Sequence, residues 1–133
     1  MRARFIGLDP WIPPLDTVEI RAAGRHLDLH NDTALLGVRL GGYPVVALTI
    51  DFRHDRHGAF ALAFRDVEEL HLEQSGLSSD GWSGTPEGEP EGVDIVQYYE
   101  YGRELPPVFE IQSVDLRLKF RAWEVEYLPG NGR

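Results

Sequence analysis

Hydrophobic and polar residues alternate most regularly between Val45 and Glu73. Two segments with this pattern, VVALTIDF and AFALAF, stand on either side of the polar connector RHDRHG. Successive side chains of a β-strand point to opposite faces, and a connector that ends in glycine is typical of a turn. The pattern therefore predicts a β-hairpin with one buried face. Its apolar positions are Val46, Leu48, Ile50, Phe52, Phe60, Leu62 and Phe64.

Shorter alternating segments occur on both sides of this hairpin, and no stretch keeps a helical period over three turns. We count about nine or ten strands in all, separated by turn signals such as Ala23-Gly24, Asn31-Asp32 and Gly41-Gly42. This arrangement predicts an all-β fold, an antiparallel β-sandwich or open barrel. A chain of 133 residues has the size of a single domain, so we expect one domain over residues 1–133.

Four segments depart from the regular pattern. Three prolines predict that residues 1–16 form an irregular arm, with Trp11 docked on the body of the protein. In RDVEELHLE, after Phe64, Leu70 and Leu72 are expected to face inward after a bend at Asp66. The apolar phase changes from even to odd positions between Phe120 and Trp123, which predicts a bulge or turn at Arg121-Ala122. Residues 74–93 hold five glycines and predict one long, acidic, Gly-rich loop.

The last two alternating segments carry opposite charges on their outward faces. Arg117, Lys119 and Arg121 make one segment basic, and Glu124 and Glu126 make the next one acidic. We expect cross-strand ion pairs between these neighbours, each of which contributes little to stability.

Composition narrows the possible functions. A net charge of −9 repels phosphate backbones, so nucleic-acid binding is not expected. The longest apolar run, near Val45 to Ile50, is too short to span a bilayer, and the N-terminal residues lack the apolar core of a secretory signal. Together with the absence of cysteine, this favours a cytoplasmic protein without membrane contact.

Two groups of histidines are candidate metal ligands. His54 and His57 flank Asp55 in the hairpin connector, and imidazole and carboxylate groups suit zinc or similar ions. However, the adjacent arginines oppose the binding of a further cation. His26, Asp28 and His30 share one face of a predicted strand, but the two histidines are about 13 Å apart at Cα. His71 also points outward and joins them if the strands pair. We expect no metal or other cofactor, and keep a small-ligand or metal-binding domain as the alternative hypothesis.

No segment has the pattern of a catalytic site. The serines near residue 80 do not lie in a nucleophile elbow, and GLSSDGWSG lacks the lysine of a phosphate-binding loop. We therefore expect a binding protein and not an enzyme.

The acidic segment is the most distinctive candidate for partner binding. An aromatic anchor surrounded by carboxylates suits a basic protein surface, because the ring supplies contact area and the charges steer association. Alternatively, the segment is a solvated linker whose Trp82 packs back onto the sheet. A third hypothesis is a homodimer through the face that carries Ala59, Ala61 and Ala63. The predicted partner-binding residues are Asp80, Trp82, Glu87, Glu89, Glu91 and Asp94.

Two phrases, FALAFRDVEELHLE and AWEVEYLP, lie within residues 59–73 and 122–129. In them the chain resembles small bacterial all-β proteins, some of which are immunity proteins of bacterial toxin systems. The resemblance implies an acidic, non-catalytic inhibitor that blocks a cognate toxin.

Overall fold

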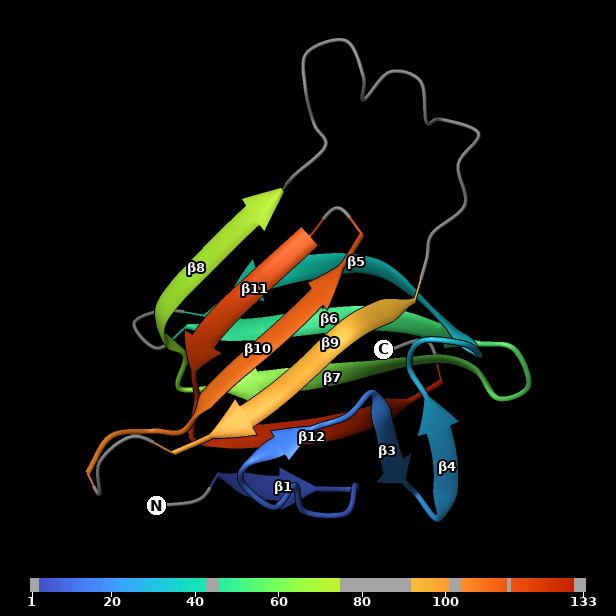
Figure 1. The fold of residues 1–133 in the computed structure, drawn as a ribbon, viewed down its shortest axis with the longest axis horizontal. Helices are drawn as coiled ribbons and strands as arrows, with labels where there is room; N and C mark the ends of the chain where they lie inside the picture. The colour runs from blue at the N-terminus through green and yellow to red at the C-terminus, as the bar shows by residue number, and fades with distance from the viewer. Residues whose placement is uncertain (1–2, 43–45, 75–91, 101–103, 115, 131–133) are drawn as a thin grey trace, which may run out of the picture.

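The chain folds into two five-stranded sheets that pack face to face and a separate two-stranded sheet (Figure 1). The computed structural model describes residues 3–42, 46–74, 92–100, 104–114 and 116–130, and these contain twelve strands and no helix. The predicted all-β sandwich is confirmed. The strands are β1 (Arg4–Ile6), β2 (Leu15–Asp16), β3 (Glu19–Ala22), β4 (Arg25–Asp28), β5 (Thr33–Gly41), β6 (Ala47–His54), β7 (Gly58–Arg65), β8 (Glu68–Gln74), β9 (Val93–Tyr99), β10 (Val108–Ser113), β11 (Leu116–Arg121) and β12 (Glu124–Pro129).

Four of the nine pairs of neighbouring strands join strands that are not consecutive in the chain: β1-β12, β12-β7, β2-β9 and β8-β11. The first sheet has the order β1-β12-β7-β6-β5, in which β1 runs parallel to β12 and the other pairs are antiparallel. The second sheet has the order β2-β9-β10-β11-β8 and is antiparallel throughout. Strands β3 and β4 form the small third sheet. Among the described residues, no helix is long and apolar enough to cross a lipid bilayer.

The predicted hairpin is formed by β6 and β7, which pair over their whole length. Leu48, Ile50 and Phe52 on β6 are fully buried and face Phe64, Leu62 and Phe60 on β7. Because β7 lies in the middle of the first sheet, its alanine face is also covered: Ala61 and Ala63 are 0% and 4% exposed in the single chain. These alanines therefore offer a second copy of the chain almost no surface.

The N-terminal arm is more ordered than predicted, because it contributes β1 to the first sheet and β2 to the second. Strands of two or three residues are too short to show an alternation, so the sequence pattern misses them. The docking of Trp11 is confirmed: its ring is 3% exposed and packs against Phe5, Tyr98 and Phe109. The arm thus closes one edge of the sandwich.

The change of apolar phase at Arg121-Ala122 marks the point where the chain crosses between the sheets. Strand β11 belongs to the second sheet and β12 to the first, and Ala122 is fully buried between them. The amide of Ala122 donates to Pro107 O at 3.2 Å, and the amide of Trp123 donates to Arg65 O at 3.3 Å. The predicted turn is therefore confirmed, and its role is to change sheets.

Strand β8 forms an edge of the second sheet, and this changes how its residues are buried. The predicted bend at Asp66 is confirmed by a backbone φ of 58°. Leu72 pairs with the buried Leu118 but is 43% exposed, so its predicted inward packing is only partial. A second positive φ, 53° at Glu69, coincides with a register shift against β11.

Candidate functional site

The histidines of the β6–β7 connector stabilise the turn. His54 is 5% exposed, and its Nδ1 accepts hydrogen bonds from the amides of Arg56 at 3.0 Å and His57 at 3.2 Å. Because Nδ1 already accepts from two backbone amides, only Nε2 of His54 remains to bind a metal ion.

The two rings of this connector stack and do not converge. The ring centroids of His54 and His57 are 4.6 Å apart, with an interplanar angle of 23°. Partial desolvation lowers the pKa of His57, and the positive charges of Arg25 and Arg56 lower it further. Nitrogen lone pairs lie in the ring planes, so stacked rings aim them along parallel directions and not at one point. The described residues contain no group of three or more His, Asp or Glu suited to a metal ion.

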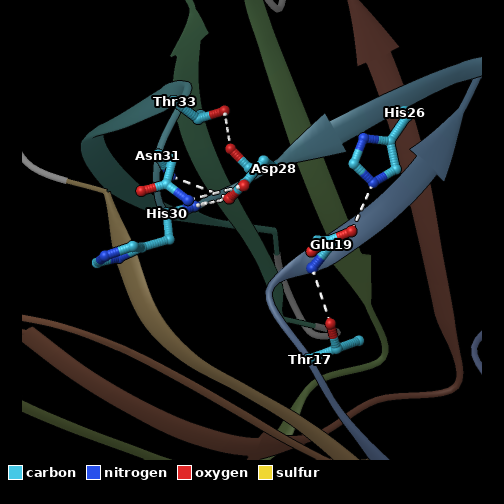
Figure 2. Close-up of polar contacts among 7 residues, drawn as sticks. All are labelled: Thr17, Glu19, His26, Asp28, His30, Asn31 and Thr33. Atoms are coloured by element: carbon cyan, nitrogen blue, oxygen red, sulfur yellow. Dashed lines mark hydrogen bonds and ion pairs between the residues drawn. The ribbon is translucent and has the colours of Figure 1, made fainter.

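His26, Asp28 and His30 also fail to converge, as Figure 2 shows. Strand β4 ends at Asp28, so His30 lies in the following turn and not on the predicted strand face. His26 Nε2 donates to Glu19 Oε1 on β3 at 2.7 Å, whereas the ring of His30 points toward β9.

Asp28 closes the turn that follows β4. Its Oδ1 accepts hydrogen bonds from the amides of His30 at 2.9 Å and Asn31 at 3.0 Å, and its Oδ2 accepts one from Asn31 Nδ2 at 3.0 Å. The hydrogen bond from the backbone amide of Asn31 is the main reason that the pKa of Asp28 lies below its ordinary value. The carboxylate is thus committed to the turn, which fixes the backbone at His30.

The start of β9 is held against this turn by a contact that we call the Gly92 clamp, formed by Leu29, His30, Gly92, Val93 and Asp94. The Val93 amide donates to Leu29 O at 2.8 Å. His30 Nδ1 donates to Val93 O at 3.0 Å and lies 3.2 Å from Asp94 Oδ1. A Cβ at Gly92 would lie 2.2 Å from His30 O, so the close approach of the two backbones requires glycine.

The clamp contains the one predicted partner-binding residue that the structure describes. Asp94 is exposed at the surface beside His30. The other five, Asp80, Trp82, Glu87, Glu89 and Glu91, lie outside the described residues.

The predicted ion pairs between the last two strands are wrong, because β11 and β12 lie in different sheets. Glu124 on β12 instead bonds Arg4 Nη2 at 2.6 Å and Arg65 Nη1 at 2.9 Å. Arg65 Nη1 also lies 2.8 Å from Glu126 Oε1. The network therefore links β1, β12 and β7.

The basic face of β11 instead lines a pocket of about 370 Å³ on the side of the second sheet that points away from the core. His71 on β8 belongs to it, and Figure 1 places β8 and β4 far apart, so the expected grouping of His71 with His26 and His30 is wrong. We call this site the charged pocket. Its lining residues are Glu69, His71, Glu73, Val108, Arg117, Lys119, Phe120 and Arg121.

Both arginines of the charged pocket are held by acceptors. Arg117 Nε donates to Glu110 Oε2 at 3.2 Å, and Gln112 Nε2 donates to the same oxygen at 2.6 Å. Arg121 Nε donates to Glu69 Oε1 at 3.3 Å, and its Nη1 donates to Pro106 O at 2.7 Å. The alternation along β11 shows these charges, but the sequence does not reveal that β8 and β10 flank them.

Comparison of the chain with protein-family models, curated proteins and solved structures finds no match in any of the three.

Proposed function

We propose that this protein is a non-enzymatic binding protein that captures a basic protein partner through acidic residues between Asp80 and Asp94. The observation that carries the proposal is the Gly92 clamp, which fixes one end of this acidic segment to the body of the protein. Val93 and Asp94 are bonded to Leu29 and His30, and that turn is itself held by Asp28. A recognition segment with a rigid base loses less conformational entropy when it binds.

The distribution of charge supports the same proposal. No lysine or arginine occurs between residues 75 and 99, whereas this range contains Asp80, Glu87, Glu89, Glu91 and Asp94. Elsewhere Arg4, Arg39, Arg65, Arg117 and Arg121 are each within 3.3 Å of a carboxylate oxygen. These arginines are already committed to ion pairs, so they do little to cancel the acidic excess near residues 80–94.

The inhibitor role belongs to this proposal and comes from the resemblance to immunity proteins. Blocking a toxin by covering a basic surface requires complementary charge and an aromatic anchor, which Trp82 supplies, and it requires no bond-breaking chemistry. A cytoplasmic location is part of the same proposal.

Affinity capture from an extract of the source organism tests the proposal. We expect the wild-type protein to retain a basic protein at about 50 mM salt and to release it at about 500 mM, because salt screens exposed charges. Trp82→Ala and a variant with four neutralised carboxylates should not retain it. That variant is Asp80→Asn with Glu87→Gln, Glu89→Gln and Glu91→Gln.

A control with the same change in net charge separates local recognition from general acidity. It neutralises four exposed carboxylates outside the segment and should capture the partner as the wild type does. If this control and the four-carboxylate variant lose the partner equally, the proposed location is wrong. If the wild type retains no basic protein beyond those that Trp82→Ala and the four-carboxylate variant also retain, the proposed function is wrong. The control carries Asp16→Asn, Asp55→Asn, Glu68→Gln and Glu104→Gln.

A further inference from the structure

Two side chains that line the charged pocket, Lys119 and His71, are available to bind a ligand. Lys119 on β11 is directly opposite His71 on β8, and residues opposite each other in an antiparallel pair point to the same face. In the described part of the chain, neither the Lys119 amine nor the His71 ring has a hydrogen bond or an ion pair. Both line the pocket and retain donors for a bound group.

The carboxylates on either side of Lys119 are already bonded to arginines. Glu110 is opposite Lys119 on the other side, but its Oε2 already accepts from Arg117 and Gln112. Arg121, two residues beyond Lys119, bonds Glu69 and Pro106 O. The neighbouring acidic groups are thus engaged with the arginines, which leaves Lys119 as the cation available to a ligand.

Charge and shape indicate what the pocket binds. Three cations, Arg117, Lys119 and Arg121, are balanced by the three carboxylates Glu69, Glu73 and Glu110, so the site tolerates one added negative charge better than two. The volume of about 370 Å³ is typical of a small-molecule site. Val108 and Phe120 are also part of the lining, but they are only 3% and 1% exposed, so the surface open to a ligand is mainly that of the charged side chains.

We propose that the charged pocket binds the carboxylate of a small organic acid, with Lys119 and His71 donating to its oxygens. This site is separate from the acidic segment 80–94 and goes beyond partner capture.

Titration with sodium benzoate, followed by amide chemical shifts, tests the proposal. We expect saturable shifts on β8, β10 and β11. Lys119→Gln should raise the dissociation constant about tenfold or more by removing a charged donor, while Lys119→Arg keeps a cation and should bind. His71→Ala, at an exposed position, should weaken binding several-fold and gives a second variant if Lys119→Gln does not fold.

Two control ligands decide the chemistry. Benzyl alcohol has a similar ring without the charge and should cause no saturable shifts in the pocket. Inorganic phosphate carries more charge and should bind less tightly than benzoate. Benzoate shifts that survive both Lys119→Gln and His71→Ala, equal binding of benzyl alcohol, or tighter binding of phosphate would each overturn the proposal. None of these outcomes affects partner capture, which is measured without any organic acid.

Discussion

The histidines show at single-residue scale why candidate ligands are difficult to identify from spacing. His26 bonds Glu19, His30 bonds Val93 O and His54 accepts two backbone amides. The partners of His26 and His30 lie on other strands, and those of His54 lie in the turn that follows it. The sequence shows that imidazoles are present, but the contacts that occupy their nitrogens are created by the fold.

Gly92 is the residue on which the clamp depends most closely. The three nearest atoms to a Cβ at this position would be backbone atoms of Leu29 and His30, at 2.2 to 2.8 Å. Backbone atoms cannot rotate away as a flexible side chain can. Any larger residue must therefore push β9 away from the turn after β4.

We predict that Gly92→Ala lowers the free energy of unfolding by about 2 kcal/mol, because the clash separates the Val93 amide from Leu29 O. Urea denaturation measures this change. Gly37→Ala is the matched control: no heavy atom lies within 4 Å of a Cβ there, so stability should change by less than about 0.5 kcal/mol. Equal effects of the two substitutions would show that the clamp does not contribute to stability.

At the scale of single strands, alternation predicts burial well where a strand has a paired neighbour along each of its two edges. Strands β6 and β7 have neighbours on both sides, and the inward residues of the predicted hairpin that lie on these strands, Leu48 to Phe52 and Phe60 to Phe64, are buried. Strand β8 has the same pattern but lies at an edge, so Leu72 stays partly exposed. The period of a pattern identifies the inward face, whereas the position in the sheet decides how deeply that face is covered.

The position in the sheet also explains the charged strands. β11 and β12 follow one another in the chain, yet their charges are matched by different strands. Arg4 and Glu124, which are 120 residues apart in sequence, form one of the shortest ion pairs described. No local pattern contains that information.

The Glu124 network predicts a pH dependence. The hydrogen bond from Arg4, and then that from Arg65, lowers the pKa of Glu124 below its ordinary value of 4.5, although partial burial opposes the shift. The stabilisation is therefore present above about pH 4.5 and is lost as the pH falls through the lower folded-state pKa. At pH 7, Glu124→Gln should unfold with a free energy about 1 kcal/mol lower than that of the wild type.

The difference between the two proteins should shrink between pH 7 and pH 3, because the wild-type carboxyl takes up a proton as the pH falls through its lowered folded-state pKa. Denaturant titrations at both pH values provide the measurement. Glu73→Gln is the control, because Glu73 is 70% exposed and 4.0 Å from Arg117, so its substitution should have almost no effect at either pH. A Glu124→Gln deficit that persists undiminished at pH 3 would exclude the ionic explanation.

For the whole molecule, the sequence predicted the class of fold and most of its strands. It did not predict the strand order, because β1 pairs with β12 and β8 with β11 through contacts distant in sequence. The charged pocket was missed for the same reason: His71, Val108 and Lys119 come from three strands that only the sheet topology brings together. The Gly92 clamp likewise joins the turn after β4 to the start of β9, which are separate in the sequence.

At this scale the protein combines a net charge of −9 with several arginines that are already paired. We infer that the carboxylates between residues 80 and 94, a range without lysine or arginine, attract a basic partner, and that the clamp fixes Val93 and Asp94 at the end of this range. This is the central claim about function.

The affinity for the captured partner as a function of salt tests that claim most directly. Once the partner is purified, titration calorimetry should show a dissociation constant that rises about tenfold or more between about 50 and 500 mM salt. The four-carboxylate variant should bind weakly with little dependence on salt, while the matched control follows the wild type. A dissociation constant that does not change with salt, or equal salt dependence in all three proteins, would contradict the account.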